Sequence, residues 1–363
     1  MSRLIDFAPV RFGVAGLGRA GMFHIERIGL RDDCKVVAVY DDCSEARNRA
    51  RLHAFECHAS WSEFLHNDDI EVVLLAAPPA LHAELAIAAL AAGKHVLIET
   101  PMCLNLVEAD AIVAASSRTG RSVSVAHLRR WDDDFRTAQT ALAAGELGPA
   151  QAIKLINWQY NPRMSNGHSN GARVSTGHSP RAEASPGFDV AADNWRNAAA
   201  TGGGVLWEFG IHYFDQLLQL AGPAVESVYA RFAPAIPALR GEDAFLAIIA
   251  FSGDLVAHVE VSRVAPAPLS TGWMIAGARG SYAGFTHYCP NPDGEVVDLP
   301  LSAAPSQADE FYTQLARHLR FGEFNPVPAE EARGPIALIA AVRESARSGQ
   351  VVSVNDPRTV LIR

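Results

Sequence analysis

The chain has 363 residues, about twice the length of a typical single domain, so we expect two domains. Hydrophobic residues make up 49% of the sequence and charged residues 20%, a composition that argues against extensive disorder. The 31 basic and 40 acidic residues give a net charge of −9, which lacks the basic excess of a general nucleic-acid-binding protein, so we expect no nucleic-acid partner.

Cysteine usage and apolar run length indicate the expected compartment. The five cysteines form no Cys-x-x-Cys pair, so we expect reduced thiols in a cytoplasmic protein. The first residues, Met-Ser-Arg-Leu-Ile-Asp, contain no apolar segment of a signal peptide. The longest apolar run, residues 72–81, contains two prolines and is far shorter than the roughly 20 residues that span a bilayer. We therefore expect no membrane partner.

The first third of the chain alternates strand and helix signals. Apolar runs typical of buried strands fall at residues 11–15, 35–40, 72–76, 95–98 and 122–126. Helical stretches separate them, and one of these, residues 79–92, is alanine-rich and ends at Gly93. Near-continuous apolar strands separated by helices predict an α/β fold with a doubly wound (Rossmann) parallel sheet over residues 1–126.

After residue 126 the strands become longer and alternate apolar with polar residues. They fall at residues 151–160, 224–232, 244–251 and 255–263, and two helices follow at 307–321 and 329–348. This alternation predicts an α/β domain over residues 127–363 with an open, mostly antiparallel sheet, to which we assign substrate binding and oligomerisation. Residues 162–189 have neither a strand nor a helix period and predict a long surface loop.

A glycine-rich turn follows the first predicted strand. Its residues are Gly16, Leu17, Gly18, Arg19, Ala20 and Gly21. Such glycines permit a tight turn and let a pyrophosphate approach the N-terminus of the next helix. Asp41 ends the second predicted strand, where a carboxylate would bind the ribose hydroxyls and repel a 2′-phosphate. The pattern therefore predicts dinucleotide binding, with NAD favoured over NADP.

Three further motifs carry a family resemblance. Gly-Lys-His-Val at residues 93–96 is followed by Glu99-Thr100-Pro101, Leu-Arg-Arg-Trp occupies residues 128–131, and a glycine triplet at 202–204 precedes Glu208 and His212. In combination these motifs resemble the glucose–fructose oxidoreductase / inositol dehydrogenase (Gfo/Idh/MocA) family of NAD(P)-dependent sugar and polyol dehydrogenases. The resemblance extends along nearly the whole chain.

The resemblance implies roles for particular residues. Family enzymes surround the reacting carbon with the lysine of a Glu-Lys-Pro motif and an Asp–His pair, and the matching positions here are Thr100, Glu208 and His212. His212 is the expected general base, and Glu208, four residues earlier, would orient its imidazole. Further expected cofactor contacts come from the segments that follow the predicted strands at 72–76 and 95–98. They are Ala77, Pro78, His82, Glu99 and Pro101.

Expected substrate contacts come from the second half of the chain. Arg129 and its neighbour Arg130 can reach a phosphate or substrate carboxylate, or can form an ion pair between the domains. Trp195 and Arg196 look like a further family landmark; Trp195 can face a sugar or pack against a sheet. We assign Arg129, Trp195 and Arg196 to the substrate. The histidines and aspartates at 168, 178, 189 and 193 lack compact ligand spacing, so we expect no metal.

The chain departs from the family pattern at several polar positions. Thr100 replaces the lysine, and threonine can donate a hydrogen bond but cannot carry a proton near neutral pH. Leu128 and Pro79 each replace an asparagine. Either the substrate differs from a simple polyol, or catalysis depends on His212 and other groups, or oxidoreduction has been lost.

The expected function is NAD-dependent hydride transfer at a secondary alcohol or ketone of a sugar, cyclitol or related polyol. Two alternatives stay open: an enzyme that uses NAD transiently for elimination or glycoside cleavage, and a non-catalytic sensor of nucleotide or sugar. Family members commonly pair through an exposed sheet face, which implies a homodimer or homotetramer.

Overall fold

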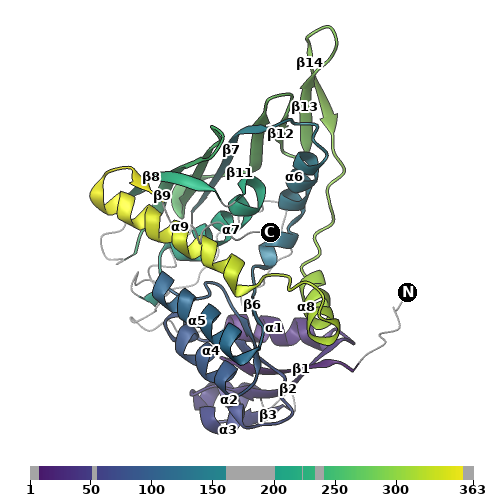
Figure 1. Cartoon of the computed structure of the whole chain (residues 1–363), viewed down its shortest axis with the longest axis vertical. Coiled ribbons are helices and arrows are strands. Elements are labelled where there is room, and N and C mark those ends of the chain that lie inside the picture. Colours follow the sequence, from purple (N-terminus) through teal and green to yellow (C-terminus); the bar gives the residue numbers. More distant parts are fainter. Residues whose placement is uncertain (1–7, 51–54, 161–200, 223, 234–240, 355–363) are drawn as a thin grey trace.

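The structure is a computed structural model, and it describes residues 8–50, 55–160, 201–222, 224–233 and 241–354. The described residues form two sheets, one of six strands at the lower end of Figure 1 and one of nine strands at the upper end. The expected α/β fold, with one doubly wound sheet and one open sheet, is therefore confirmed. No helix in the described part of the chain is long and apolar enough to cross a membrane.

The six-stranded sheet is parallel throughout, in the order β3-β2-β1-β4-β5-β6. Its strands are β1 (Val10–Ala15), β2 (Cys34–Tyr40), β3 (Glu56–His58), β4 (Val72–Leu75), β5 (His95–Ile98) and β6 (Val123–Val125). Its helices are α1 (Arg19–Gly29), α2 (Ser44–Ala50), α3 (Trp61–Leu65), the 3₁₀ turn η2 (Pro79–Leu81), α4 (His82–Ala91) and α5 (Leu106–Thr119). The carboxyl ends of the parallel strands share one edge of the sheet. The expected cofactor residues all lie near this edge: just after β1, β2, β4 or β5, in the first turn of α1, or at the start of α4.

The nine-stranded sheet has the order β14-β13-β12-β11-β7-β10-β9-β8-β15 and is antiparallel except for the β7–β10 pair. Its first five strands are β7 (Ala150–Tyr160), β8 (Val225–Ala233), β9 (Ala244–Phe251), β10 (Val256–Ser262) and β11 (Val264–Gly277). The others are β12 (Ser281–Ala283), β13 (Thr286–Pro290), β14 (Val296–Pro300) and β15 (Val352–Ser353). The associated helices are η3 (Leu128–Trp131), α6 (Asp133–Ala143), the π-helical turn η7 (Leu206–Gly210), α7 (Ile211–Ala221), α8 (Glu310–Phe321) and α9 (Ala329–Ser348).

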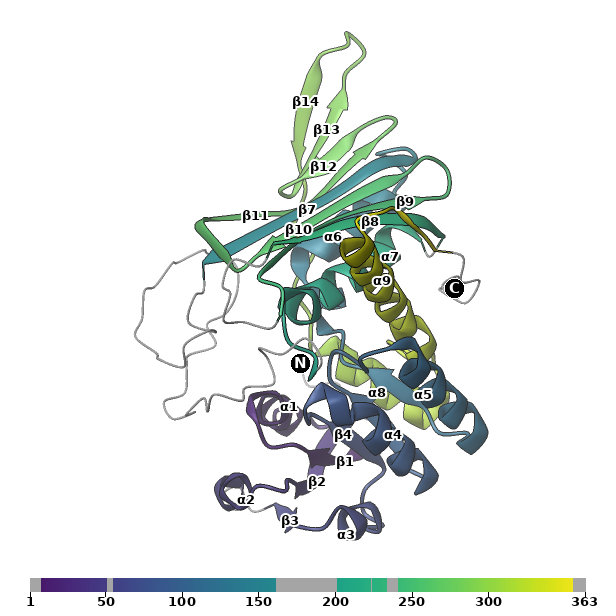
Figure 2. The same ribbon diagram turned by 90° about the vertical axis from the view of Figure 1, so that its left-hand side faces the viewer.

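Helices cover one face of the nine-stranded sheet. In Figure 2, α6, α7 and α9 lie beneath it, and no described helix covers the opposite face. Residues Ile153, Leu155 and Val259 are buried on the helix side. The alternate positions hold Lys154, His258 and Ile248, which is 40% exposed, so the alternation seen in the sequence corresponds to one packed and one open face.

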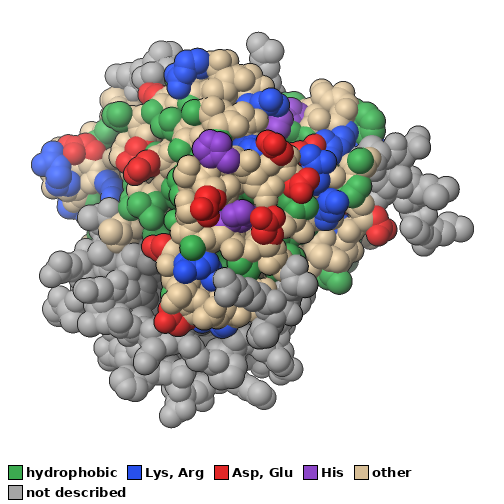
Figure 3. Space-filling model, turned by 90° about the horizontal axis from the view of Figure 1, so that it is seen from below, with side chains coloured by type: hydrophobic (Ala, Val, Ile, Leu, Met, Phe, Trp, Pro, Cys, Tyr) green, Lys and Arg blue, Asp and Glu red, His purple; other side chains and the backbone are tan. Residues whose placement is uncertain are grey.

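A buried ion-pair network joins η3 to two helices of the second sheet. The Arg130 guanidinium donates two hydrogen bonds of 2.8 Å to the carboxylate of Asp215 in α7 and one of 2.8 Å to Glu331 in α9. All three side chains are at most 9% exposed. Arg130 thus forms an ion pair, but both of its partners lie within residues 127–363 rather than in the other predicted domain. Seen from below, acidic, basic and apolar side chains are interspersed over the described surface (Figure 3).

Candidate functional site

The glycine-rich turn has the geometry that its sequence predicts. Gly16 has a φ of +95°, and a Cβ on it would lie 2.6 Å from the backbone of Ala76. A Cβ on Gly21 would lie 1.9 Å from the carbonyl oxygen of Gly16, so only glycine allows α1 to pack this closely against β1. A Cβ on Gly18 would meet nothing within 4 Å. The turn is therefore tight at its first and third glycines and open at the second.

The N-terminus of α1 fits an anionic group. Gly18 is its N-cap residue, no side chain caps the helix, and its first turn contains no acidic residue. The backbone N–H groups of a first helical turn have no partner within their own helix, and the helix dipole favours an anion there. Together with the open space at Gly18, this end of α1 fits the pyrophosphate of a dinucleotide.

Asp41 lies beside this turn, at the carboxyl end of β2. Its Oδ2 accepts a hydrogen bond of 2.7 Å from the Leu17 N–H, and its Oδ1 accepts one of 2.9 Å from the Cys43 N–H. The Arg47 guanidinium donates to the carbonyl oxygens of Asp41 and Asp42, at 2.6 and 2.9 Å. The two backbone N–H groups thus hold the Asp41 carboxylate next to the glycine turn, while Arg47 is bound to backbone.

His82 joins the segments that follow β4 and β5. Its ring is 1% exposed, with Nδ1 2.9 Å from the carbonyl oxygen of Pro101 and Nε2 2.8 Å from that of Ala77. Burial lowers the pKa of His82, although both carbonyls act in the opposite direction. Both ring nitrogens face backbone. His82 therefore bridges the segments that follow β4 and β5.

Thr100 and His212 meet although 112 residues separate them in the sequence. Thr100 Oγ1 lies 3.5 Å from His212 Nε2 and 3.4 Å from Glu99 Oε2. Burial and the nearby charge of Arg129 lower the pKa of His212 to about 3, so the imidazole is neutral at pH 7. Its Nδ1 is buried and has no hydrogen-bond partner among the described residues. A neutral imidazole and a hydroxyl therefore lie side by side beyond the carboxyl end of β5.

Glu99 supplies a negative charge beside this pair. Burial disfavours its ionisation, but the hydrogen bonds that it accepts from His24 and from the Thr100 N–H lower the pKa of Glu99 to about 2. The Thr100 N–H donates to Glu99 Oε2 at 2.7 Å. The carboxylate is therefore ionised at neutral pH.

His127 is a residue of this site that sequence reasoning missed. Its ring is 1% exposed and stands edge-on to that of His212, with 6.0 Å between ring centroids and an interplanar angle of 84°. Its Nδ1 lies 3.7 Å from Asp215 Oδ2. The available signal was a histidine two residues after β6, at the sheet edge where ligands bind in such folds.

The other expected site residues have varied surroundings. Glu208 lies in the π-helical turn η7, just before α7, where the spacing of an ordinary helix does not apply. Arg129, 44% exposed, lies 3.7 Å from Asp132, and its charge acts on His212. Trp195, Arg196 and the predicted loop at 162–189, including its histidines, lie outside the described residues.

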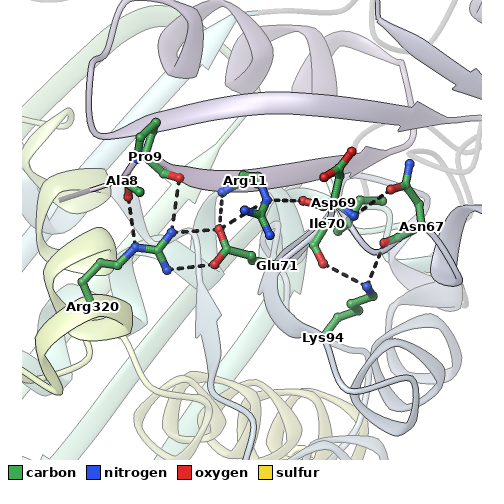
Figure 4. Close-up of polar contacts among 9 residues, drawn as sticks. All are labelled: Ala8, Pro9, Arg11, Asn67, Asp69, Ile70, Glu71, Lys94 and Arg320. Carbon is green, nitrogen blue, oxygen red and sulfur yellow. Dashed lines mark hydrogen bonds and ion pairs between the residues drawn. The ribbon is translucent and has the colours of Figure 1, made fainter.

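Lys94 lies at the opposite edge of the six-stranded sheet and so cannot replace the absent lysine. Its amino group donates to the carbonyl oxygens of Asn67 and Ile70, at 2.8 and 2.9 Å (Figure 4). Beside it, Arg320 of α8 donates to both oxygens of Glu71, at 2.9 and 2.8 Å. Glu71 and Lys94 lie just before β4 and β5, at the amino edge of the sheet. The contact between Arg320 and Glu71 therefore ties α8 to this edge, away from Thr100.

Residues 10–127 match the oxidoreductase family with an NAD-binding Rossmann fold. Residues 135–283 match the GFO/IDH/MocA C-terminal domain. Together with the dinucleotide-type turn, these matches define the protein as an NAD(P)-binding oxidoreductase. The chain belongs to the GFO/IDH/MocA family, which confirms the resemblance found in its motifs.

Relatives match along almost the full length of the chain. It is 25% identical over 372 residues to the uncharacterized oxidoreductase YdgJ of Escherichia coli, covering 93% of this chain and 96% of that protein. It is 24% identical over 372 residues to the scyllo-inositol 2-dehydrogenase (NADP(+)) IolW of Bacillus subtilis, covering 94% and 95%. Its fold is similar to the crystal structure of an NAD-binding protein from Listeria innocua, with a TM-score of 0.80, 25% identity and coverage of 98% and 99%.

Proposed function

We propose that this protein transfers hydride between NAD and a secondary alcohol or ketone of a sugar, cyclitol or related polyol. The observation that carries the proposal is the 3.5 Å separation of Thr100 Oγ1 and His212 Nε2, because one hydroxyl oxygen of a substrate can hydrogen-bond to both atoms at that spacing. The similarity to IolW, a scyllo-inositol 2-dehydrogenase, supports a cyclitol or similar substrate.

In the proposed mechanism the substrate hydroxyl accepts a hydrogen bond from Thr100 Oγ1 and gives its proton to His212 Nε2. Bound NAD supplies the hydride acceptor. Because His212 is neutral at pH 7, its Nε2 can accept the proton while Nδ1 carries the other ring hydrogen. In the reverse direction His212 would first take up a proton, which burial of its ring disfavours, and then return it to the ketone oxygen. Thr100 binds and orients the substrate but carries no proton.

The remaining expected roles belong to the same proposal. Glu208, in the preceding turn, keeps the expected role of orienting the imidazole of His212, although His212 Nδ1 has no hydrogen-bond partner among the described residues. The half-exposed guanidinium of Arg129, with Trp195 and Arg196, would contact the substrate. The cofactor would bind along the glycine turn, Asp41 and the segments that follow β4 and β5, within a domain of residues 1–126. Residues 127–363 would form the substrate-binding and oligomerisation domain.

The proposed preference for NAD over NADP rests on Asp41. Asp41→Asn removes the charge but keeps an oxygen that accepts a backbone N–H. We expect this change to improve the ratio of NADP to NAD binding by about tenfold or more, because a 2′-phosphate no longer meets a fixed carboxylate. Titration of each oxidised cofactor by calorimetry measures the ratio. Asp42→Asn removes the same charge one residue away and is the matched control; an equal effect of both variants would contradict the role of Asp41.

We propose that the protein acts in the cytoplasm as a homodimer or homotetramer. All five cysteines are unpaired in the structure, in keeping with reduced thiols. The open face of the nine-stranded sheet carries Ile248 and Val256, 40% and 42% exposed, next to charged neighbours. Light scattering is expected to give the mass of two or four chains, and Ile248→Asp is expected to lower it. A monomer at micromolar concentration would rule this assembly out.

The function is tested by mixing the purified protein with NAD⁺ and a panel of sugars, inositols and sugar alcohols. An increase in nicotinamide absorbance with at least one member is the expected result. Folded protein that binds no NAD(H), or that reduces NAD⁺ with no member of the panel, would overturn the proposal. Conversion of a substrate without net reduction of NAD⁺ would instead favour transient use of the cofactor.

A further inference from the structure

A buried chain of polar contacts leads from α8 to the candidate proton carrier. Tyr312 Oη lies 2.7 Å from His24 Nδ1, and His24 Nε2 lies 2.7 Å from Glu99 Oε1. His24 and Tyr312 are both fully buried, at 0% exposure. Their positions in the sequence, on α1 and on α8, are 288 residues apart. Two hydrogen bonds in series therefore link α8, through His24 of α1, to the Glu99 carboxylate.

The direction of each hydrogen bond follows from the chemistry of the groups. An ionised carboxylate can only accept, so His24 Nε2 donates to Glu99 Oε1. In a neutral His24 ring the other nitrogen, Nδ1, then accepts from the Tyr312 hydroxyl. The Tyr312 hydroxyl thus favours the His24 tautomer that binds Glu99. The second oxygen of Glu99 accepts the Thr100 N–H, so both oxygens are held.

His212 is surrounded by charges of both signs. Arg129 and His127, from the segment after β6, disfavour a positive charge on its ring. Glu99, after β5, and Asp215, of its own helix α7, favour one. Asp215 is already bound to Arg130 by two hydrogen bonds, whereas Glu99 is bound to no arginine or lysine in the described part of the chain. Glu99, held by His24 and the Thr100 N–H, is thus the neighbouring carboxylate that no arginine or lysine in the described part of the chain neutralises.

We propose that His24 and Tyr312 are positioning residues for proton transfer at His212: they hold the Glu99 carboxylate in place as the anion that stabilises His212 when it carries the substrate proton. The inference rests on the proposed role of His212 and extends it by two residues that do not reach the substrate. The proton moves from the substrate hydroxyl to His212 Nε2, and the charge of Glu99 is unchanged by the step. Because burial disfavours the imidazolium, a fixed anion whose charge acts on the ring affects how readily the ring accepts the proton.

The test measures the titration of His212 directly. Protein labelled with ¹³C and ¹⁵N in histidine is titrated with acid by NMR, with NAD⁺ bound, and the His212 signal is assigned by its loss in His212→Gln. An anion stabilises the imidazolium, so its displacement lowers the midpoint. His24→Leu is expected to lower the His212 midpoint by about 0.5 or more on the pH scale. His24→Gln, which keeps an N–H donor toward Glu99, is expected to lower it less.

Tyr312→Phe decides the question if His24→Leu does not fold. It removes a single hydroxyl, and we expect a mixture of His24 tautomers in the ¹⁵N spectrum and a downward shift of the His212 midpoint. A folded variant lacking the His24 donor or the Tyr312 hydroxyl, with an unchanged His212 midpoint, would overturn the inference. The NMR result is independent of the proposed function. The proposed function fails if His212→Gln keeps full turnover, whatever the His212 midpoints in the variants are.

Discussion

Replacing His212 by glutamine is expected to lower kcat for polyol oxidation by a factor of about 10²–10⁴, the usual contribution of a positioned acid–base group. Glutamine approximates the size and polarity of the ring, but its amide cannot take up the hydroxyl proton. Thr100 cannot compensate, because a hydroxyl does not hold an extra proton near neutral pH. The measurement is steady-state reduction of NAD⁺ with the best substrate of the panel. KM is expected to change much less than kcat.

His66→Gln is the matched control, because His66 is an exposed residue at the end of α3 in the first half of the chain, away from Thr100. We expect its kcat to stay within about twofold of the original value, since surface substitutions away from a site have small effects. If His212→Gln retained a kcat within threefold of the original, His212 would not be the proton carrier. Circular dichroism of both variants separates a catalytic effect from a loss of folding.

Replacing Arg130 by methionine is expected to lower the free energy of unfolding by about 3–5 kcal/mol. Arg130 compensates two buried carboxylates, those of Asp215 and Glu331, through three hydrogen bonds of 2.8 Å. Methionine preserves much of the side-chain volume, but it leaves both carboxylates without their cation. Urea unfolding followed by tryptophan fluorescence measures the change.

The neighbouring variant Arg129→Met is the control. Arg129 is 44% exposed and its ion pair with Asp132 is 3.7 Å long, so its removal is expected to cost less than about 1 kcal/mol. In the parent protein the charge of Arg130 lowers the pKa of Asp215, although burial acts in the opposite direction. That contribution is present above the pKa of an unfolded aspartate and is lost as the pH falls through the lowered folded value. The cost of Arg130→Met should therefore shrink in acid; equal costs for both variants would contradict the network.

The glycine turn and the parallel strands could be predicted because their signals are local. Gly16, Gly18 and Gly21 lie within six residues of one another. A side chain at Gly16 or Gly21 would clash with the backbone, whereas the space beside Gly18 is open. The edge strand β3 was missed because it has only three residues. β11 was missed because it contains two prolines and pairs with β7 through several register shifts, so it shows no regular alternation.

The site could be predicted only in part, because its contacts join distant segments. Thr100 and His212 were paired through the family resemblance, since no spacing rule links positions 112 residues apart. His24, Tyr312 and His127 were not identified, because each is an unremarkable buried side chain until the fold is known. Glu99 was expected to contact the cofactor, but its hydrogen bonds to His24 and Thr100 depend on tertiary packing.

The central claim is that hydride leaves a polyol carbon for NAD while His212 holds the hydroxyl proton. The most direct test uses a substrate from the panel deuterated at its carbinol carbon, with mass spectrometry of the nicotinamide cofactor after reaction. We predict that the reduced cofactor carries the deuterium, and that His212→Gln slows its appearance by the same factor as kcat. Conversion of the substrate by NAD-bound protein without deuterium in the reduced cofactor would contradict the claim.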